Sequence, residues 1–334
     1  MSDYTIRPMR PDDTQAILSL LTTCLGQTVI PRTKEFWNWK HFQNPFGTSP
    51  GLVAESGNQM IGLRVFMQWI WKSDRSELRS ARAVDTATHP DWRGKGIFSD
   101  LTTKLLEDCL KNELSFIYNT PNGSSLPGYL KMGWKVVGKL SIWFRPLRPF
   151  RMMRRALLRN ANQSNSNQDP NQSLTKILPE EVDDQILQIQ DNRLQTKRST
   201  DYLKWRYEHI PGIRYSVKHA QKKNASAMMI YRERFRNGMK ELSISELFMS
   251  VGNAGISLAR DVVEESLRES SADYAISLAA QKSAEQAALY HARFFPIPRL
   301  GPVFTVRELN MNDSYPPISD WKNWRCSIGD LELF

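Results

Sequence analysis

Apolar residues divide the first 145 positions into a regular series of predicted elements. Between residues 14 and 24 they recur at three- and four-residue spacing behind two aspartates, which is typical of an amphipathic helix. Apolar runs at 51–55, 59–71 and 82–88 predict strands, with a hairpin turn at 56–58. A helix is predicted over 97–112 and another strand over 116–119. This order favours an α/β (α+β) fold, with a mixed sheet and helices packed on it.

The second half of the chain repeats part of this pattern. Aromatic, basic and proline positions between Phe36 and Pro45 recur 166 positions later, between Tyr202 and Pro211. A second match, between 129–134 and 290–295, has an offset of 161. Two matches at nearly equal offsets favour an internal repeat, in which strand 241–249 and helix 256–267 are the later copies.

A polar tract marks the expected boundary between two domains. Residues 160–173 contain too few apolar side chains to offset the entropy of ordering them, so we interpret them as a linker. The expected division is a first domain at 1–144, an arginine-rich segment and linker at 145–173, and a second domain at 174–334.

The net charge of +10 could indicate a nucleic-acid partner, but its distribution argues against one. Residues 145–160 carry six arginines and no acid, whereas the residues that follow balance 22 basic with 22 acidic side chains. We therefore expect no nucleic-acid partner. The segment from Arg145 to Arg159 has two interpretations: a basic helix packed within the protein, or a contact with a membrane surface or partner protein.

Cysteine use and hydropathy bound the cellular setting. The N-terminus has no signal-peptide pattern, and no run of about 18 apolar residues occurs. The cysteines are few, scattered and not at metal-binding spacing: Cys24, Cys109 and Cys326. We expect a cytoplasmic protein without a bound metal.

The segment that carries candidate chemistry lies between the strand ending at Thr88 and the helix beginning at Ile97. It contains Arg93, Gly94, Lys95 and Gly96. Glycines allow a tight turn that points successive N–H groups into one concavity, and the helix that starts at Ile97 adds its positive end. The segment is therefore predicted to bind a pyrophosphate.

This loop resembles the Arg/Gln-x-x-Gly-x-Gly/Ala signature of the GCN5-related N-acetyltransferase (GNAT) superfamily. Arg93 and Gly96 match the signature, whereas Phe98 stands at its final small position. The resemblance spans roughly residues 4–144 and implies acetyl-CoA as co-substrate. Together with the internal repeat, it implies two GNAT-like domains, each with a mixed, mostly antiparallel sheet flanked by helices.

The same resemblance assigns further residues to the coenzyme. Thr86, Ala87 and Thr88 would lie on the strand that parts from its neighbour to admit the pantetheine arm, and a backbone N–H there would stabilise the carbonyl oxygen. Asn119 and Asn122 would contact the coenzyme beyond the next strand.

Tyr129 is the residue expected near the coenzyme sulfur, where its phenol could protonate the departing thiolate. Asp85 and His89 are the two candidates for the base that accepts the amine proton, although Asp85 could instead pair with an arginine and His89 could only shape the loop. Trp37, Trp39 and His41 could line the acceptor side, but such aromatic clusters are more often core.

The second half lacks the features of a coenzyme site. Its counterpart loop, 250–255, has no basic residue, and Ala280 and Ser283 stand in the places of Asn119 and Asn122. We therefore expect a degenerate domain that completes the acceptor pocket or supports a homodimer, with Tyr207, His209 and 324–334 as lining.

Three functions remain open from the sequence. The first is transfer of an acetyl group from acetyl-CoA to a primary amine of a small acceptor, such as an amino sugar, by direct attack. The second is a tRNA-dependent aminoacyl transferase of the type that builds peptidoglycan bridges. The third is a non-catalytic acyl-CoA-binding or scaffold protein.

Overall fold

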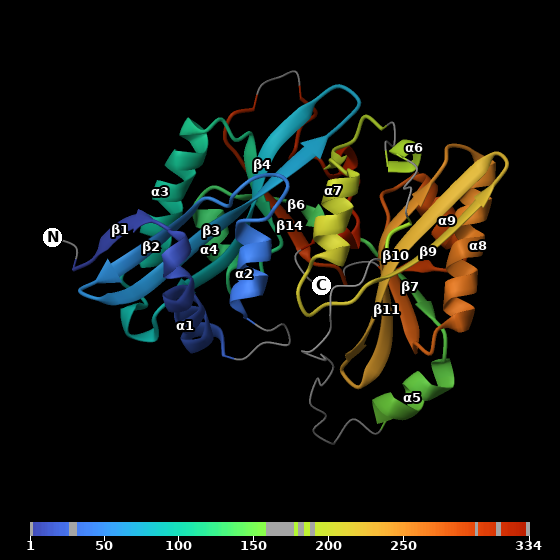
Figure 1. The fold of residues 1–334 in the computed structure, drawn as a ribbon, viewed down its shortest axis with the longest axis horizontal. Helices are drawn as coiled ribbons and strands as arrows, with labels where there is room; N and C mark the ends of the chain where they lie inside the picture. The colour runs from blue at the N-terminus through green and yellow to red at the C-terminus, as the bar shows by residue number, and fades with distance from the viewer. Residues whose placement is uncertain are drawn as a thin grey trace. The chain divides into compact units, whose positions relative to one another are not determined.

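The fold is given by a computed structural model, which describes residues 3–26, 32–157, 177–179, 184–187, 191–297, 300–311 and 315–331 (Figure 1). The predicted linker over 160–173 lies outside these residues. The chain forms two compact units: the first consists of Met1–Gly138 and Val303–Trp321, and the second of Lys139–Pro302 and Lys322–Phe334.

The first unit is built on a mixed sheet with the strand order β1-β2-β3-β4-β5-β14-β6. Neighbours from β1 to β4 are antiparallel, β4 and β5 are parallel, and β5 and β14 are antiparallel. The bounds of these strands are β1 Thr5–Pro8, β2 Gly51–Ser56, β3 Gln59–Lys72, β4 Glu77–Thr88, β5 Phe116–Asn119, β6 Lys135–Lys139 and β14 Val303–Glu308.

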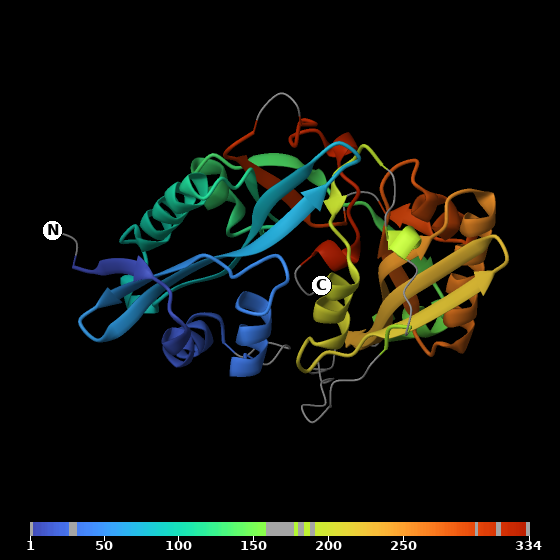
Figure 2. The same cartoon turned by 45° about the horizontal axis from the view of Figure 1, so that its top comes forward.

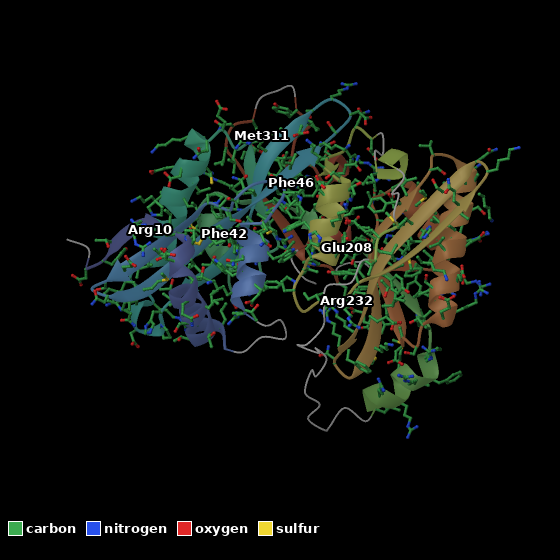
Figure 3. The ribbon with its side chains drawn as sticks, in the orientation of Figure 1. Arg10, Phe42, Phe46, Glu208, Arg232 and Met311 are labelled. Carbon is green, nitrogen blue, oxygen red and sulfur yellow. The ribbon has the colours of Figure 1, made fainter. Side chains whose placement is uncertain are left out.

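Four helices cover this sheet: α1 Thr14–Leu25, α2 Lys34–His41, α3 Ile97–Lys111 and α4 Leu126–Lys131. The predicted periodicity of α3 is confirmed, because its residues at i, i+4, i+8 and i+12 are buried on the sheet. Helices α1 and α2 lie against the face opposite to α3 (Figure 2). Phe46, which follows α2 (Figure 3), packs edge-on against Trp69 of β3, with ring centroids 5.4 Å apart.

The second unit has its own mixed sheet, with the strand order β13-β7-β12-β11-β10-β9. Its longest helix, α8, packs its apolar face into the second core with residues of β10 and β11. The strands of this sheet are β7 Ile142–Pro146, β9 Ser216–Lys222, β10 Ala225–Arg236, β11 Met239–Met249, β12 Tyr274–Leu278 and β13 Phe295–Ile297. The short strand β8 Gln195–Thr196 belongs to this unit but not to this sheet. The helices are α5 Pro149–Leu157, α6 Asp184–Leu187, α7 Thr200–Leu203, α8 Asn253–Glu269 and α9 Ala284–His291.

The two sheets share a β-bulge at corresponding places. In the first unit the register between β3 and β4 shifts at Arg64 and Val65, which leaves Asp85 of β4 without an opposite residue. In the second unit the register between β10 and β11 shifts at Ile230, 166 positions after Arg64. The offset equals that of the aromatic repeat, so the internal repeat extends to this irregularity.

The observed partition differs from the linear division expected at residue 144. Strand β7 pairs with β12 and belongs to the second sheet, although most of it was assigned to the first domain. Strand β14, far along the chain, pairs with β5 and belongs to the first sheet. Each unit therefore contains chain from both halves of the sequence.

The arginine-rich segment contains the end of β7 and helix α5, and its described part is anchored within the second unit. Arg151 and Arg155 both form ion pairs with Asp273, at 2.8 and 3.1 Å, and the Asp273 side chain is fully buried. Arg145 pairs with Glu264 at 2.6 Å, and Arg148 donates to the carbonyl of Ser270 at 2.9 Å. These contacts favour the packed-helix interpretation for the four arginines.

The outward face of α5 is apolar, with Phe150, Met153 and Leu157 exposed at i, i+3 and i+7. A membrane or partner contact through this face stays a prediction. In the described part of the chain, no helix is long and apolar enough to cross a membrane.

Candidate functional site

The glycine loop joins β4 to α3, as predicted. Gly94 and Gly96 adopt φ angles of 77° and 83°, in the left-handed region that other residues rarely occupy. A Cβ atom at either position would meet nothing within 4 Å, so the backbone conformation rather than lack of space requires glycine. Arg93 and Lys95 are exposed beside them.

The start of α3 is suited to an anion. Gly96 occupies the N-cap position and has no side chain, so no side-chain cap satisfies the first backbone N–H groups of the helix, which begins at Ile97. Free N–H groups at a helix N-terminus attract phosphate through hydrogen bonds and the helix dipole. The five predicted loop residues, Arg93, Gly94, Lys95, Gly96 and Ile97, are therefore brought together at one helix end.

Strands β4 and β5 part next to this loop. Their parallel pairing covers only Ser80–Arg82 against Phe116–Tyr118, whereas β4 continues to Thr88. Thr86, Ala87 and Thr88 therefore extend beyond the paired part of β5 and are held by β3 on their other side. The three predicted residues therefore lie on the part of β4 that is past its pairing with β5 and that continues toward the glycine loop.

The two predicted asparagines have structural roles. Asn119 is buried, and its side-chain oxygen accepts a hydrogen bond from the Thr305 hydroxyl of β14. Asn122 accepts the backbone N–H groups of Ser124 and Ser125 at 3.1 and 2.9 Å, which orders the approach to α4. Asn122 thus supports the helix that carries Tyr129.

Tyr129 lies inside the first unit, close to the parting strands. Its ring packs edge-on against Phe98 and Trp134, with centroids 6.0 and 5.1 Å away. Its hydroxyl oxygen accepts a hydrogen bond of 2.9 Å from Arg64, which also donates to the Thr86 hydroxyl. Phe98, the departure from the family signature, therefore covers the tyrosine.

Arg64 is the site residue that the sequence analysis missed. It stands in an apolar strand pattern, with Leu63 before it and Val65 after it, and is fully buried. A lone arginine within such a run was the available signal, since buried charged residues are rare.

Asp85 lies at the β-bulge with a φ of 37°, a strained backbone conformation. Its carboxylate contacts Lys40 at 2.5 Å and His41 at 2.9 Å, both from α2. The His41 ring is buried and reaches the Ser49 hydroxyl through its other nitrogen at 3.0 Å. Burial acts to raise the pKa of Asp85, but Lys40 and His41 outweigh it and hold the pKa well below its usual range. The partner is thus a lysine and a histidine rather than an arginine.

His89 shapes the loop. Its backbone N–H donates to Ile61 at 2.8 Å, and its ring Nδ1 accepts the N–H of Asp91 at 3.4 Å. No hydrogen bond joins His89 or Asp85 to Tyr129 in the described part of the chain, so the structure does not bring these three predicted catalytic residues into direct contact. Trp37, Trp39 and His41 are buried core residues of α2.

We expect Asp85→Asn to lower the free energy of unfolding by about 3 kcal/mol at pH 7, because the buried Lys40 ammonium loses this carboxylate. The pKa of Asp85 is depressed in the folded protein, so its stabilisation is complete above about pH 4 and is lost as the pH falls further. Urea unfolding at pH 7, 5 and 3 should therefore show a difference that shrinks only in the most acidic sample.

Asp91→Asn is the control for this measurement, since the Asp91 side chain is 84% exposed. It should unfold like the wild type at each pH. A constant difference between wild type and Asp85→Asn down to pH 3 would show that the charge of Asp85 does not contribute.

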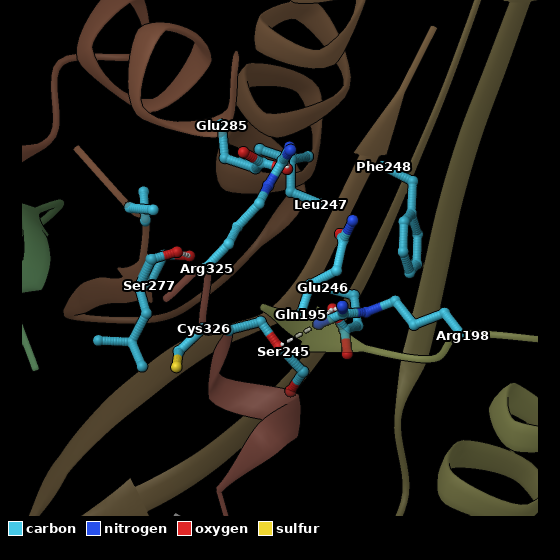
Figure 4. A pocket seen from close by; sticks show the side chains of 14 residues that line it. Gln195, Arg198, Ser245, Glu246, Leu247, Phe248, Ser277, Glu285, Arg325 and Cys326 are labelled. Atoms are coloured by element: carbon cyan, nitrogen blue, oxygen red, sulfur yellow. Dashed lines mark hydrogen bonds and ion pairs between the residues drawn. The ribbon is translucent and has the colours of Figure 1, made fainter. Parts of the chain in front are cut away.

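The second unit has a parting of strands at the corresponding place, but its own chain occupies it. Strands β11 and β12 pair only at Glu241–Ser243 and Tyr274–Ile276. Beyond that point lies a cavity of about 30 Å³, room for one or two water molecules rather than a pantetheine arm. Cys326 and Ser327 of the C-terminal segment line it together with residues of both strands (Figure 4).

Buried ion pairs close this second site. Arg198, which lies beside Glu246 in Figure 4, bonds that carboxylate at 3.0 Å. It also bonds Asp330 at 3.1 Å. Burial raises the pKa of Glu246, although Arg198 acts to lower it. The pKa of Arg198 is raised, because the two carboxylates outweigh the effect of burial. Arg325 pairs with Glu285. Tyr207 and Trp324, which we expected to line an acceptor pocket, are core residues of this unit.

The described ranges contain no group of three or more His, Cys, Asp or Glu side chains that could hold a metal ion.

Comparison with known proteins connects these features to a family. The sequence model of a family described as "Acetyltransferase (GNAT) domain" matches residues 5–137. A search of curated proteins finds no match.

Solved structures share the fold across most of the chain. A probable N-acyltransferase from Enterococcus faecalis is 13% identical, with a TM-score of 0.60, and the match covers 92% of this chain and 73% of that one. A GCN5-related N-acetyltransferase from Anabaena variabilis is 12% identical, with a TM-score of 0.59 and the same coverage. A putative acetyltransferase from Pyrococcus horikoshii is 10% identical, with a TM-score of 0.53 and coverage of 99% and 95%. At these identities the likeness shows the fold.

Proposed function

We propose that the first unit of this chain is a GNAT acetyltransferase domain, as the family model that matches residues 5–137 supports, and that the protein transfers an acetyl group from acetyl-CoA to a primary amine of a small acceptor. The observation that carries the proposal is the uncapped start of α3 behind two left-handed glycines, beside the parting of β4 and β5. An amino sugar is the first acceptor to test.

The residues divide into three roles. The loop from Arg93 to Gly96 and the first N–H groups of α3 would bind the pyrophosphate, and the free end of β4 would hold the pantetheine arm and stabilise the carbonyl oxygen. Tyr129 would protonate the thiolate that leaves when the amine attacks. Holding amine and thioester in contact supplies much of the acceleration, and no covalent enzyme intermediate is needed.

The two candidate bases differ in their fitness for proton transfer. Asp85 is a weak base, because Lys40 and His41 keep its pKa far below neutrality. In a neutral imidazole only one nitrogen is an acceptor, and in His89 that nitrogen is Nδ1, so proton transfer would replace its long 3.4 Å contact with the Asp91 N–H by a contact with the amine or a water. We therefore favour His89 over Asp85 as the base.

The alternatives are less well supported. A tRNA-dependent enzyme would use the arginine-rich segment for phosphates, but Arg145, Arg148, Arg151 and Arg155 already bond groups of the second unit. A non-catalytic protein would not require Tyr129 beside the parting strands.

Calorimetric titration with acetyl-CoA tests the proposal. In an Arg93→Ala, Gly96→Glu variant we expect binding at least about 30-fold weaker, because a side chain at a positive φ costs about 1–2 kcal/mol and a carboxylate repels phosphate. Release of free CoA thiol on addition of an amine then tests turnover.

Gly57→Glu is the matched control, since Gly57 also has a positive φ and an open surrounding but lies in the hairpin between β2 and β3. It should bind acetyl-CoA like the wild type. If the wild type does not bind, or if the loop variant binds equally well, the proposal fails.

A further inference from the structure

Arg64 is a buried arginine without a charged partner. Its relative exposure is 0%, and no carboxylate of the described residues lies within ion-pair distance of it. Its Nε and Nη2 groups also lack hydrogen-bond partners within the described ranges. Burial lowers the pKa of the guanidinium, and the contact with Tyr129 opposes that shift only in part.

A buried arginine without a carboxylate partner lowers the stability of the fold, and another buried arginine of this chain does have such partners. Arg198, equally deep in the second unit, has Glu246 and Asp330 beside it, and its pKa lies well above the ordinary value. A buried charge without such compensation destabilises a fold. Arg64 is therefore poorly explained by stability.

The contacts of Arg64 point to Tyr129. A guanidinium can only donate hydrogen bonds, so the Tyr129 oxygen must be the acceptor in the 2.9 Å contact. The hydrogen of the tyrosine hydroxyl must then point elsewhere, and the described residues offer it no recorded acceptor. The ring of Phe66 covers the guanidinium at 4.7 Å and keeps it in place.

The repeat shows that the fold does not require this pair. Ile230 stands at the bulge of the second unit, where the first unit has Arg64. Tyr290, the repeat counterpart of Tyr129, is 69% exposed. The unit without a basic glycine loop thus also lacks the arginine–tyrosine pair, which associates the pair with the coenzyme site.

We infer that Arg64 is a positioning residue that turns the Tyr129 hydroxyl hydrogen toward the coenzyme sulfur and stabilises the phenolate left after proton transfer. The inference rests on the proposed function. The amine nitrogen bonds to the carbonyl carbon, the carbon–sulfur bond breaks, and its electron pair stays on sulfur. The sulfur takes the Tyr129 proton, and the phenolate regains a proton that the amine has lost, through water.

The test compares Arg64→Met, Arg64→Lys, Tyr129→Phe and the Arg64→Met, Tyr129→Phe double variant. We expect Arg64→Met to lower kcat by about 10- to 30-fold with little change in KM for acetyl-CoA, and Arg64→Lys to restore part of the loss. The double variant should be no slower than Tyr129→Phe alone. The alkaline fall of kcat should move to higher pH by about one unit in Arg64→Met.

Stability distinguishes this role from a structural one. Removing an uncompensated buried charge should leave Arg64→Met at least as resistant to urea as the wild type, while its activity falls. Arg82→Met, another buried arginine of the first unit, is the control and should keep kcat within about twofold.

Additive losses in the double variant, an unmoved pH profile, or a loss confined to KM would overturn the inference. An ultraviolet titration of the phenol needs no substrate, so it separates this failure from failure of the proposed function. The difference in ultraviolet absorbance between wild type and Tyr129→Phe reports the Tyr129 phenol. It should show ionisation at lower pH than the difference between Arg64→Met and the double variant. Coincident curves would also overturn the inference.

Discussion

Tyr129→Phe is expected to lower kcat by about 100- to 1,000-fold while acetyl-CoA binding stays close to that of the wild type. The substitution keeps the ring that packs against Phe98 and Trp134 and removes only the hydroxyl that Arg64 holds. Positioning of the two substrates would be retained, so the loss reports the proton given to the thiolate. Steady-state release of CoA thiol, with calorimetry for binding, measures both quantities.

Tyr118→Phe provides the comparison for this variant. Tyr118 is a buried tyrosine of β5 in the same unit, and its ring packs against Trp71 rather than at the glycine loop. Its phenylalanine variant should retain kcat within about twofold. If Tyr129→Phe also retains kcat, water or the acceptor protonates the sulfur, and Tyr129 is a packing residue.

The local elements of the first unit could be predicted from the sequence because each has a clear period. Strands β2 and β3 and helix α3 begin within a residue of their expected positions. Strand β4 starts at Glu77 rather than 82, because its first residues alternate between exposed and buried and include the charged Glu77 and Arg79, so they do not form an apolar run. Helix α2 was not predicted, since its aromatic and charged residues show no simple stripe.

The exchange of strands between units was not predictable in the same way. Nothing in the residues of β14 indicates that they pair with β5, nearly 190 positions earlier at Asn119 and Thr305. The hydrophobic pattern identifies a strand but not its partner, because pairing depends on the whole sheet.

In the candidate site, too, local features could be predicted from the sequence, whereas contacts between distant segments could not. The glycine loop is readable because conformation alone requires glycine at positions 94 and 96. The pairing of Asp85 with Lys40 and the contact of Arg64 with Tyr129 join distant segments, so the sequence gives the residue types but not their partners.

The tight packing around Gly329 in the closed second site predicts that a side chain at this position destabilises the second unit. A Cβ atom there would overlap both the Tyr207 hydroxyl and a carboxylate oxygen of Glu246, which are hydrogen-bonded to each other at 2.8 Å. We expect Gly329→Ala to lower the free energy of unfolding of the second unit by about 3–5 kcal/mol. The added methyl group clashes with these two oxygens, and moving them away would disrupt the buried ion-pair network. Urea unfolding followed by tryptophan fluorescence, which includes the buried Trp324, measures the loss.

Two variants sharpen this measurement. Gly123→Ala is the control, since a Cβ atom there would meet nothing within 4 Å, and it should unfold like the wild type. Tyr207→Phe in the Gly329→Ala background removes one of the two overlapping oxygens, so it should recover part of the loss. Because the C-terminal segment fills the second site, acetyl-CoA binding by folded Gly329→Ala should equal that of the wild type. Weaker binding in the folded variant would show that the second unit contributes to the coenzyme site, and unchanged unfolding would show that the segment is not held as the structure describes.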